Sequence, residues 1–263
     1  MERAMSLRRL SFLIVILLLI LPANSCNEQI KVVTVGDSWA YNWGDALVDE
    51  LLSHGIQVDL YNKAVPGSTA QLWAQPGALL DVEALLLGNP DIQFIVLSIG
   101  GNDLLDGYLV GGYGEEVFPL IEQYTRSVIN ELLSYFPYLK ISLNGYDFLN
   151  FEMTPECILM GETMLGGSTY DKNILFTKLT GIAQKIAADY PQVIATNLLG
   201  AMQMATGMRA PNPFLPTPAS MMGEGDCIHP NYQGYRALMR RIYAGFFEPL
   251  LHPTNQNLNN AAI

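Results

Sequence analysis

Positive charge is scarce in this sequence. Its 263 residues include 14 Lys and Arg against 25 Asp and Glu, so the net charge at pH 7 is −11. Beyond residue 25 the Lys and Arg residues form no extended basic cluster. Because nucleic acids and anionic membrane surfaces bind to basic faces, we exclude both as partners.

Histidine and cysteine are also rare, with three of each. Their positions give no spacing that is typical of a metal site, so we expect neither a metal nor an organic cofactor. A glycine-rich stretch at residues 107–114 lacks the Lys-Ser/Thr pair of a nucleotide-binding P-loop. This lack excludes a phosphate cradle there.

Long apolar runs are confined to residues 12–21, which follow Arg3, Arg8 and Arg9 and precede small residues up to Cys26. A bilayer span needs about 20 apolar residues, whereas this pattern is typical of a cleaved signal peptide. We therefore expect a signal peptide at 1–25, an exported domain at 26–263 and a polar tail from about residue 252. The match to a lipoprotein signal is poor, but lipid anchoring at Cys26 stays an alternative to release.

Export implies an oxidising compartment, where cysteines pair. We expect a disulfide between Cys157 and Cys227, which leaves Cys26 without a partner cysteine. The alternative is that Cys157 and Cys227 are buried thiols.

The order of the expected elements predicts an α/β fold. Helical patterns end at proline before an apolar strand three times, at Pro90, Pro137 and Pro191. This alternation predicts a parallel sheet with helices on both faces, a three-layer α/β/α sandwich. The expected strands are residues 31–35, 56–61, 92–99, 139–143 and 193–197, and the expected helices are 39–52, 71–87, 115–135, 171–190 and 232–247. No linker or repeat divides the chain, so we expect one domain.

Ser38 is the first candidate for chemistry. It follows a β-branched strand through the turn residues Gly36 and Asp37, and a helical pattern begins at Trp39. Ligands bind at the carboxyl edge of such sheets, and a helix N-terminus offers free N–H groups to a developing negative charge. Ser38 is therefore a candidate nucleophile, although Asp37 or Ser38 could simply cap the helix.

A nucleophilic serine needs a base, and only three histidines are available. His54 is expected at the far end of the helix that starts near Ser38, and His252 lies in the polar tail. His229 precedes the last helix, and Asp226 three residues earlier could hold its imidazole. The alternative is that Asp226 or His229 is a helix cap.

Four segments taken together resemble the SGNH or GDSL hydrolase family. They are Gly36-Asp37-Ser38-Trp39, the loop around Gly67, Gly100-Gly101-Asn102-Asp103 and Asp226-Cys227-Ile228-His229, in the family's order. The resemblance implies a flavodoxin-like five-stranded sheet and a serine esterase. It also implies Ser38 as nucleophile, His229 as base, Asp226 as the residue that orients it, and an oxyanion hole from Ser38, Gly67 and Asn102.

Two departures from the family pattern concern the entrance for the substrate. Trp39 replaces the usual Leu, and bulky or polar residues replace the small residues that commonly follow it, at Tyr41, Asn42 and Trp43.

The substrate is expected to be a small-molecule or lipid-like ester. Two long connections, residues 144–170 and 198–225, follow the last two strands, and such loops are usually functional. They contain eight of the eleven methionines, a flexible residue type that favours an apolar acyl group of medium length: Met153, Met160, Met164, Met202, Met204, Met208, Met221 and Met222. Methionine could equally be core filler there.

Other activities are compatible with the same catalytic set. Aromatic residues in the two loops would suit a carbohydrate O-acetylesterase: Tyr146, Phe148, Phe151, Tyr170 and Phe214. An O-acyltransferase would use the same triad, and a catalytically dead binding protein would share only the fold. The sequence implies no stable protein partner and leaves the oligomeric state open.

Overall fold

The computed structural model describes residues 28–253, and a parallel sheet of five strands lies at its centre. The strand order is β2-β1-β3-β4-β5, the doubly wound order that the family resemblance implies. The predicted α/β fold is therefore confirmed. The strands are β1 (Glu28–Gly36), β2 (Ile56–Asn62), β3 (Phe94–Ser98), β4 (Lys140–Asn144) and β5 (Val193–Thr196).

β1 shows why the sheet needs cover on both sides. Val32 points into one hydrophobic core, whereas Val33 and Val35 point into the other, and all three are fully buried. Successive side chains of a strand face opposite ways, so a strand that is apolar throughout is stable only between two layers of helices.

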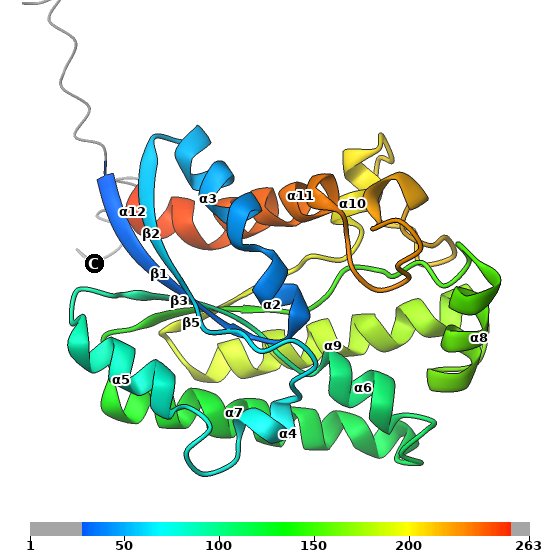
Figure 1. Cartoon of the computed structure of the whole chain (residues 1–263), viewed down its shortest axis with the longest axis horizontal. Coiled ribbons are helices and arrows are strands. Elements are labelled where there is room, and N and C mark those ends of the chain that lie inside the picture. The colour runs from blue at the N-terminus through cyan, green and yellow to red at the C-terminus, as the bar shows by residue number, and fades with distance from the viewer. Residues whose placement is uncertain (1–27, 254–263) are drawn as a thin grey trace, which may run out of the picture.

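Helices form these two layers (Figure 1). One face carries α3 (Gly44–Ser53) and α11 (Tyr232–Ile242), and α11 continues through η3 (Tyr243–Phe247) into α12 (Glu248–Leu251). The other face carries α5 (Leu80–Gly88), α7 (Val117–Tyr135) and α9 (Thr169–Asp189).

Two of the expected helices are broken into pieces. The helix expected at 39–52 is α2 (Ser38–Asn42) followed by α3. The region expected at 71–87 contains α4 (Ala70–Trp73) and then α5. Between α4 and α5, Gly77 takes a φ of +82°, a left-handed conformation that ends a helix and suits glycine.

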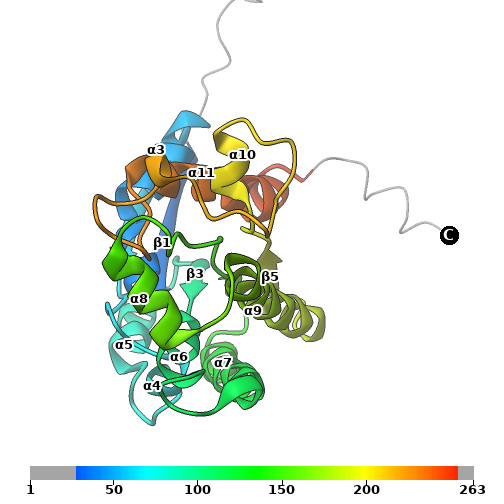
Figure 2. The ribbon, with the colours of Figure 1, turned by 90° about the vertical axis from the view of Figure 1, so that its right-hand side faces the viewer.

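Three short helices occur where the sequence pattern indicates loops. They are α6 (Gly101–Gly107), α8 (Pro155–Met164) and α10 (Ala201–Ala205). At the start of α8, the hydroxyl of Thr154 accepts from the N–H of Cys157 and proline occupies the first turn, a favourable N-terminus. α6 and α8 stand at one end of the sheet, in front of the strands (Figure 2).

The predicted disulfide is present. Cys157 in α8 is bonded to Cys227 in the loop before α11, and their Cα atoms are 5.4 Å apart. Closing a loop across 70 residues stabilises the fold by about 4 kcal/mol in the chain-entropy estimate. The predicted signal peptide, Cys26 and the end of the polar tail lie outside the described residues.

Within residues 28–253, no helix combines the length and the apolar character that crossing a bilayer requires.

Candidate active site

Ser38 is the first residue of α2, directly after β1. Gly36 has a φ of +136°, and a Cβ atom there would lie 1.9 Å from the carbonyl oxygen of Ser98, so the close pairing of β1 with β3 requires glycine. Asp37 caps the helix, because its side chain accepts from the N–H of Trp39 at 2.9 Å. Ser38 itself is therefore not the cap, and its own N–H has no acceptor within the helix.

His229 reaches Ser38 from the loop that precedes α11. Its Nε2 lies 2.7 Å from the hydroxyl oxygen of Ser38, and its Nδ1 lies 2.8 Å from Oδ2 of Asp226. The indole of Trp39 donates to the carbonyl of Ile228 at 3.2 Å and so ties this loop to α2. The structure thus brings together the three side chains of the expected triad.

Asp226 is held as an anion beside the imidazole. Its other oxygen, Oδ1, accepts from the backbone N–H groups of Ile228 and His229, each at 2.9 Å. Partial burial works toward a higher pKa, but these N–H donors and the imidazole of His229 outweigh it and lower the pKa of Asp226. A carboxylate that stays ionised can keep Nδ1 protonated, which leaves Nε2 free to accept the proton of Ser38.

Gly67 lies on a loop and Asn102 lies in a helix, and hydrogen bonds fasten these two segments to each other. Gly67 has a φ of +78°, and open space lies where a Cβ would stand. Asn102 is in the first turn of α6, and its amide nitrogen donates to the carbonyl of Ser68 at 2.8 Å. An amide nitrogen carries two N–H groups, so one remains for a ligand.

Tyr146 has a role at the site that the sequence does not reveal. It is buried, its hydroxyl donates to Oδ2 of Asp37, and it accepts from the N–H of Gly101 at 2.9 Å. It joins the Ser38 turn to the start of α6. Burial raises the pKa of Asp37 to about 6, although Tyr146 and the N–H of Trp39 lower it in part.

The sequence offers only a weak signal for this role of Tyr146. The tyrosine follows β4 at the carboxyl edge of the sheet, but its partner Asp37 is 109 residues away, a pairing that no local pattern encodes.

The methionines do not form the acyl-binding surface that the sequence suggests. Met202 and Met222 are buried in the core. Of the other six, four pack against it from the outside: Met153, Met160, Met164 and Met221. None of the eight lines the cavity beside Ser38, so in this structure they act mainly as core filler, the alternative that the sequence left open.

The aromatic residues of the long loops fall into two groups. Tyr146, Phe148 and Phe151 are buried, so the expectation that they present exposed rings is wrong. Tyr170 and Phe214 are exposed, stack on each other with ring centroids 4.5 Å apart, and line a cleft of about 510 Å³.

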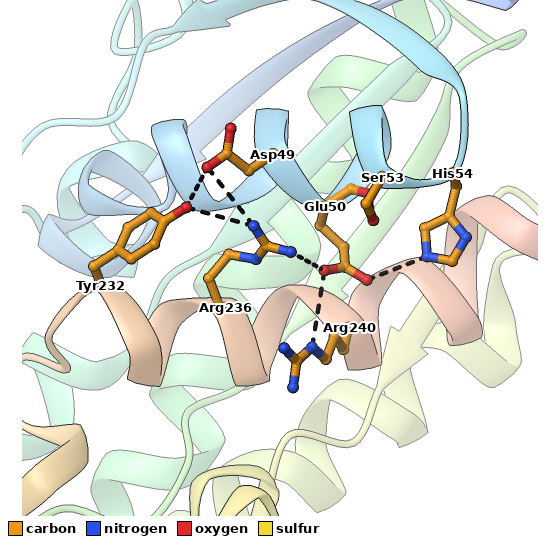
Figure 3. Close-up of polar contacts among 7 residues, drawn as sticks. All are labelled: Asp49, Glu50, Ser53, His54, Tyr232, Arg236 and Arg240. Atoms are coloured by element: carbon orange, nitrogen blue, oxygen red, sulfur yellow. Dashed lines mark hydrogen bonds and ion pairs between the residues drawn. The ribbon is translucent and has the colours of Figure 1, made fainter.

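A second histidine lies against a carboxylate elsewhere (Figure 3). Nε2 of His54, at the end of α3, is 3.2 Å from Oε1 of Glu50, and its ring stacks on Tyr243 with a centroid distance of 3.6 Å. The buried carboxylate of Glu50 also pairs with Arg236 at 3.0 Å, and Arg240 lies 4.0 Å away. This cluster ties α3 to α11.

Across the described residues, no group of three or more His, Cys, Asp or Glu side chains is placed to hold a metal ion.

Comparison with protein families gives a match over most of the chain. The family described as GDSL-like Lipase/Acylhydrolase matches residues 32–242. Among curated proteins, none matches the chain.

Several solved structures share the fold. A protein described as a GDSL-like lipase from Parabacteroides merdae has a TM-score of 0.59 at 14% identity, over 83% of this chain and 96% of its own. Axe2, an acetylxylan esterase from Geobacillus stearothermophilus, has a TM-score of 0.52 at 15% identity, over 82% and 93%. TesA has a TM-score of 0.50 at 19% identity, over 84% and 99%.

Proposed function

Because the chain belongs to the GDSL-like lipase/acylhydrolase family, we propose that it hydrolyses carboxylic esters through an acyl-enzyme formed on Ser38. One observation carries this proposal. Nε2 of His229 lies 2.7 Å from the Ser38 hydroxyl while Nδ1 of His229 lies 2.8 Å from Asp226. A hydroxyl hydrogen-bonded to an oriented base is the arrangement that nucleophilic catalysis needs.

In the first half of the reaction, Ser38 attacks the ester carbonyl and His229 takes the hydroxyl proton. The tetrahedral intermediate then collapses, the bond to the alcohol oxygen breaks, and His229 returns the proton to the departing alcohol. Asp226 stabilises the imidazolium between these steps. In the second half, water replaces the alcohol, and hydrolysis of the acyl-enzyme releases the acid.

The negative charge on the carbonyl oxygen requires donors that are already in place. We assign this role to the N–H groups of Ser38 and Gly67 and to the amide of Asn102. An oxyanion donor is typically worth about 3 kcal/mol in the transition state. Asn102 suits the role because an uncharged amide does not compete for the Ser38 proton.

Export is part of the proposal. The Cys157–Cys227 disulfide supports it, because stable disulfides are typical of oxidising compartments and rare in reducing ones. Release after cleavage at residue 25 and lipid anchoring at Cys26 can be separated by cell fractionation followed by intact-mass analysis of the exported protein.

On the acyl side, we propose an apolar group. The space beside Ser38 is walled mainly by apolar side chains, among them Leu105, Leu149, Phe176 and Ile228.

The cleft beside Tyr170 and Phe214 favours a second candidate, an ester of a saccharide. Stacked exposed rings next to the hydroxyls of Ser168 and Thr169 suit the flat face and the polar rim of a sugar. Tyr170→Ala would then raise KM for an acetylated polysaccharide and leave turnover of p-nitrophenyl acetate unchanged.

A panel of p-nitrophenyl esters tests the main proposal, with Ser38→Ala as the blank. A fluorophosphonate probe that reacts with activated serines gives a second readout. We expect turnover and labelling with the natural sequence and neither with Ser38→Ala. Failure of the natural protein to turn over any ester or to take up the probe would favour a catalytically dead binding protein.

A further inference from the structure

We infer that the acyl group is short, with acetyl preferred. This inference rests on the proposed ester hydrolysis at Ser38 and names the acid that the site accepts. It departs from the medium-chain acyl group that the methionines of the sequence suggest. The observation behind it is the size of the cavity that Ser38 and Asn102 both line, about 10 Å³.

The position of this cavity identifies it as the acyl side of the site. During attack, the carbonyl carbon must lie against the Ser38 hydroxyl and the carbonyl oxygen against the amide of Asn102. That carbon carries two substituents, the acyl group and the alcohol oxygen. The alcohol oxygen must face His229, which returns the proton to it, and His229 does not line this cavity, so the acyl group is the substituent that enters it. A volume of about 10 Å³ is close to the least that holds one water-sized group, which corresponds to the methyl of an acetyl group.

The walls of the cavity leave little room for rearrangement. Leu105, Leu149 and Phe176 are each at most 5% exposed and belong to the core. Tyr146 is fixed by its hydrogen bonds to Asp37 and Gly101.

Aromatic packing holds the walls of the cavity in place. The ring of Tyr146 packs edge-on against Trp39 and Phe176, with centroid distances of 5.1 and 6.3 Å. No methionine, the residue type that adapts most easily, contributes to the lining.

Longer acyl chains should therefore react more slowly. Forcing extra methylenes between these buried side chains carries a penalty large enough to lower the rate at least about tenfold. We expect kcat/KM for p-nitrophenyl butyrate to be at least about tenfold below that for the acetate, and the octanoate to be lower still. A butyrate or octanoate value equal to or above that of the acetate would overturn the inference while upholding ester hydrolysis. No turnover of any ester would overturn both.

Widening the cavity should weaken the preference for acetate over butyrate. Leu105→Ala removes part of the wall, and we expect it to raise the ratio of butyrate to acetate kcat/KM at least about fivefold. Leu104→Ala is the matched control, because Leu104 is a buried leucine of the same helix that does not line the cavity. We expect this control to leave the ratio unchanged.

The ratio is measured on one preparation, so it does not depend on how much of a variant folds. Where Leu105→Ala yields no active protein, Leu149→Ala widens the same cavity from another wall. Equal ratios for the widened variant and for Leu104→Ala would show that this cavity does not select the acyl group.

Discussion

Two histidines in this molecule each contact a carboxylate, and the rest of their surroundings differ. His229 has Asp226 on one ring nitrogen and the hydroxyl of Ser38 on the other. His54 has Glu50 on one nitrogen and stacks on Tyr243, while Glu50 is shared with arginine side chains (Figure 3). A histidine–carboxylate pair is therefore not sufficient evidence of an active site.

The difference lies in how the charge of the carboxylate is used. Arg236 lies 3.0 Å from Glu50 and neutralises it, so the cluster fastens one helix to another. Asp226 accepts only backbone N–H groups on its other oxygen, so its charge remains available to an imidazolium. The His229 pair also has the hydroxyl of Ser38 beside it, together with the donors that we propose for the oxyanion, whereas the His54 pair lies at the far end of α3.

The most direct test of this difference between the two histidines is to replace each of them by alanine. We expect His229→Ala, like Ser38→Ala, to lower kcat at least about a thousandfold with the fold intact, because the base or the attacking group is lost. His54→Ala should retain near wild-type turnover of a soluble ester. The reverse result, activity lost with His54 and kept without His229, would refute the assignment.

Asn102→Ala should have the next largest effect. We expect kcat to fall about a hundredfold while KM changes little, because the amide binds the oxyanion and not the ground-state ester. Steady-state kinetics on p-nitrophenyl acetate measures both. Parallel losses in kcat and in substrate affinity would instead assign Asn102 a structural role at the start of α6.

Neutralising the two carboxylates should separate catalysis from stability. Asp226→Asn should lower kcat, by less than Ser38→Ala does, and leave the free energy of unfolding nearly unchanged, because the side chain is partly exposed. Glu50→Gln should leave kcat unchanged and lower the free energy of unfolding by about 2 kcal/mol, because a buried ion pair is broken. Ester kinetics and urea unfolding on both variants measure the two effects. A loss of activity with Glu50→Gln would contradict the assignment of Glu50 to stability and Asp226 to catalysis.

A further expected effect is on the pH dependence of stability. Burial raises the pKa of Asp37 to about 6 and that of Asp147 to about 7. The folded state then binds these protons more tightly than the unfolded chain, so the free energy of unfolding should fall as pH rises from about 4 to 7. The lowered pKa of Asp226 acts with the opposite sign and only below about pH 4.

Urea unfolding at several pH values measures this slope. Asp147→Asn should flatten it, because the amide does not titrate and its oxygen can still accept from the N–H groups of Phe148 and Gly200. An unchanged slope would show that Asp147 has no raised pKa.

The sequence predicts the sheet well for a physical reason. A proline that ends a helix and an apolar run that follows it are local signals, and they identify three of the strands, those after Pro90, Pro137 and Pro191. The short helices escaped prediction because α6 begins in a glycine-rich turn and α10 has only five residues. Their stability comes from packing at the sheet edge and not from helical periodicity.

The sequence predicts those parts of the candidate site whose chemistry depends on residue type alone. A serine nucleophile needs a histidine base and a carboxylate that orients it, so the residue types point to Ser38, His229 and Asp226, and the structure places these side chains in contact. Their catalytic roles stay a prediction. Tyr146 and the cavity beside Ser38 could not be predicted, because both depend on distances between segments that are far apart in the chain.

The amide of Asn102 donates a hydrogen bond to the carbonyl of Ser68. Asp103 accepts from the N–H groups of Ala70 and Gln71, so the loop after Gly67 and the first turn of α6 are fastened together before an ester arrives. If Gly67 and Asn102 donate to the oxyanion as we propose, the conformational entropy of aligning these two donors is lost once, when the chain folds, and not again in every catalytic cycle. A flexible peptide that carried the same donors would have to order them anew for each ester that it met.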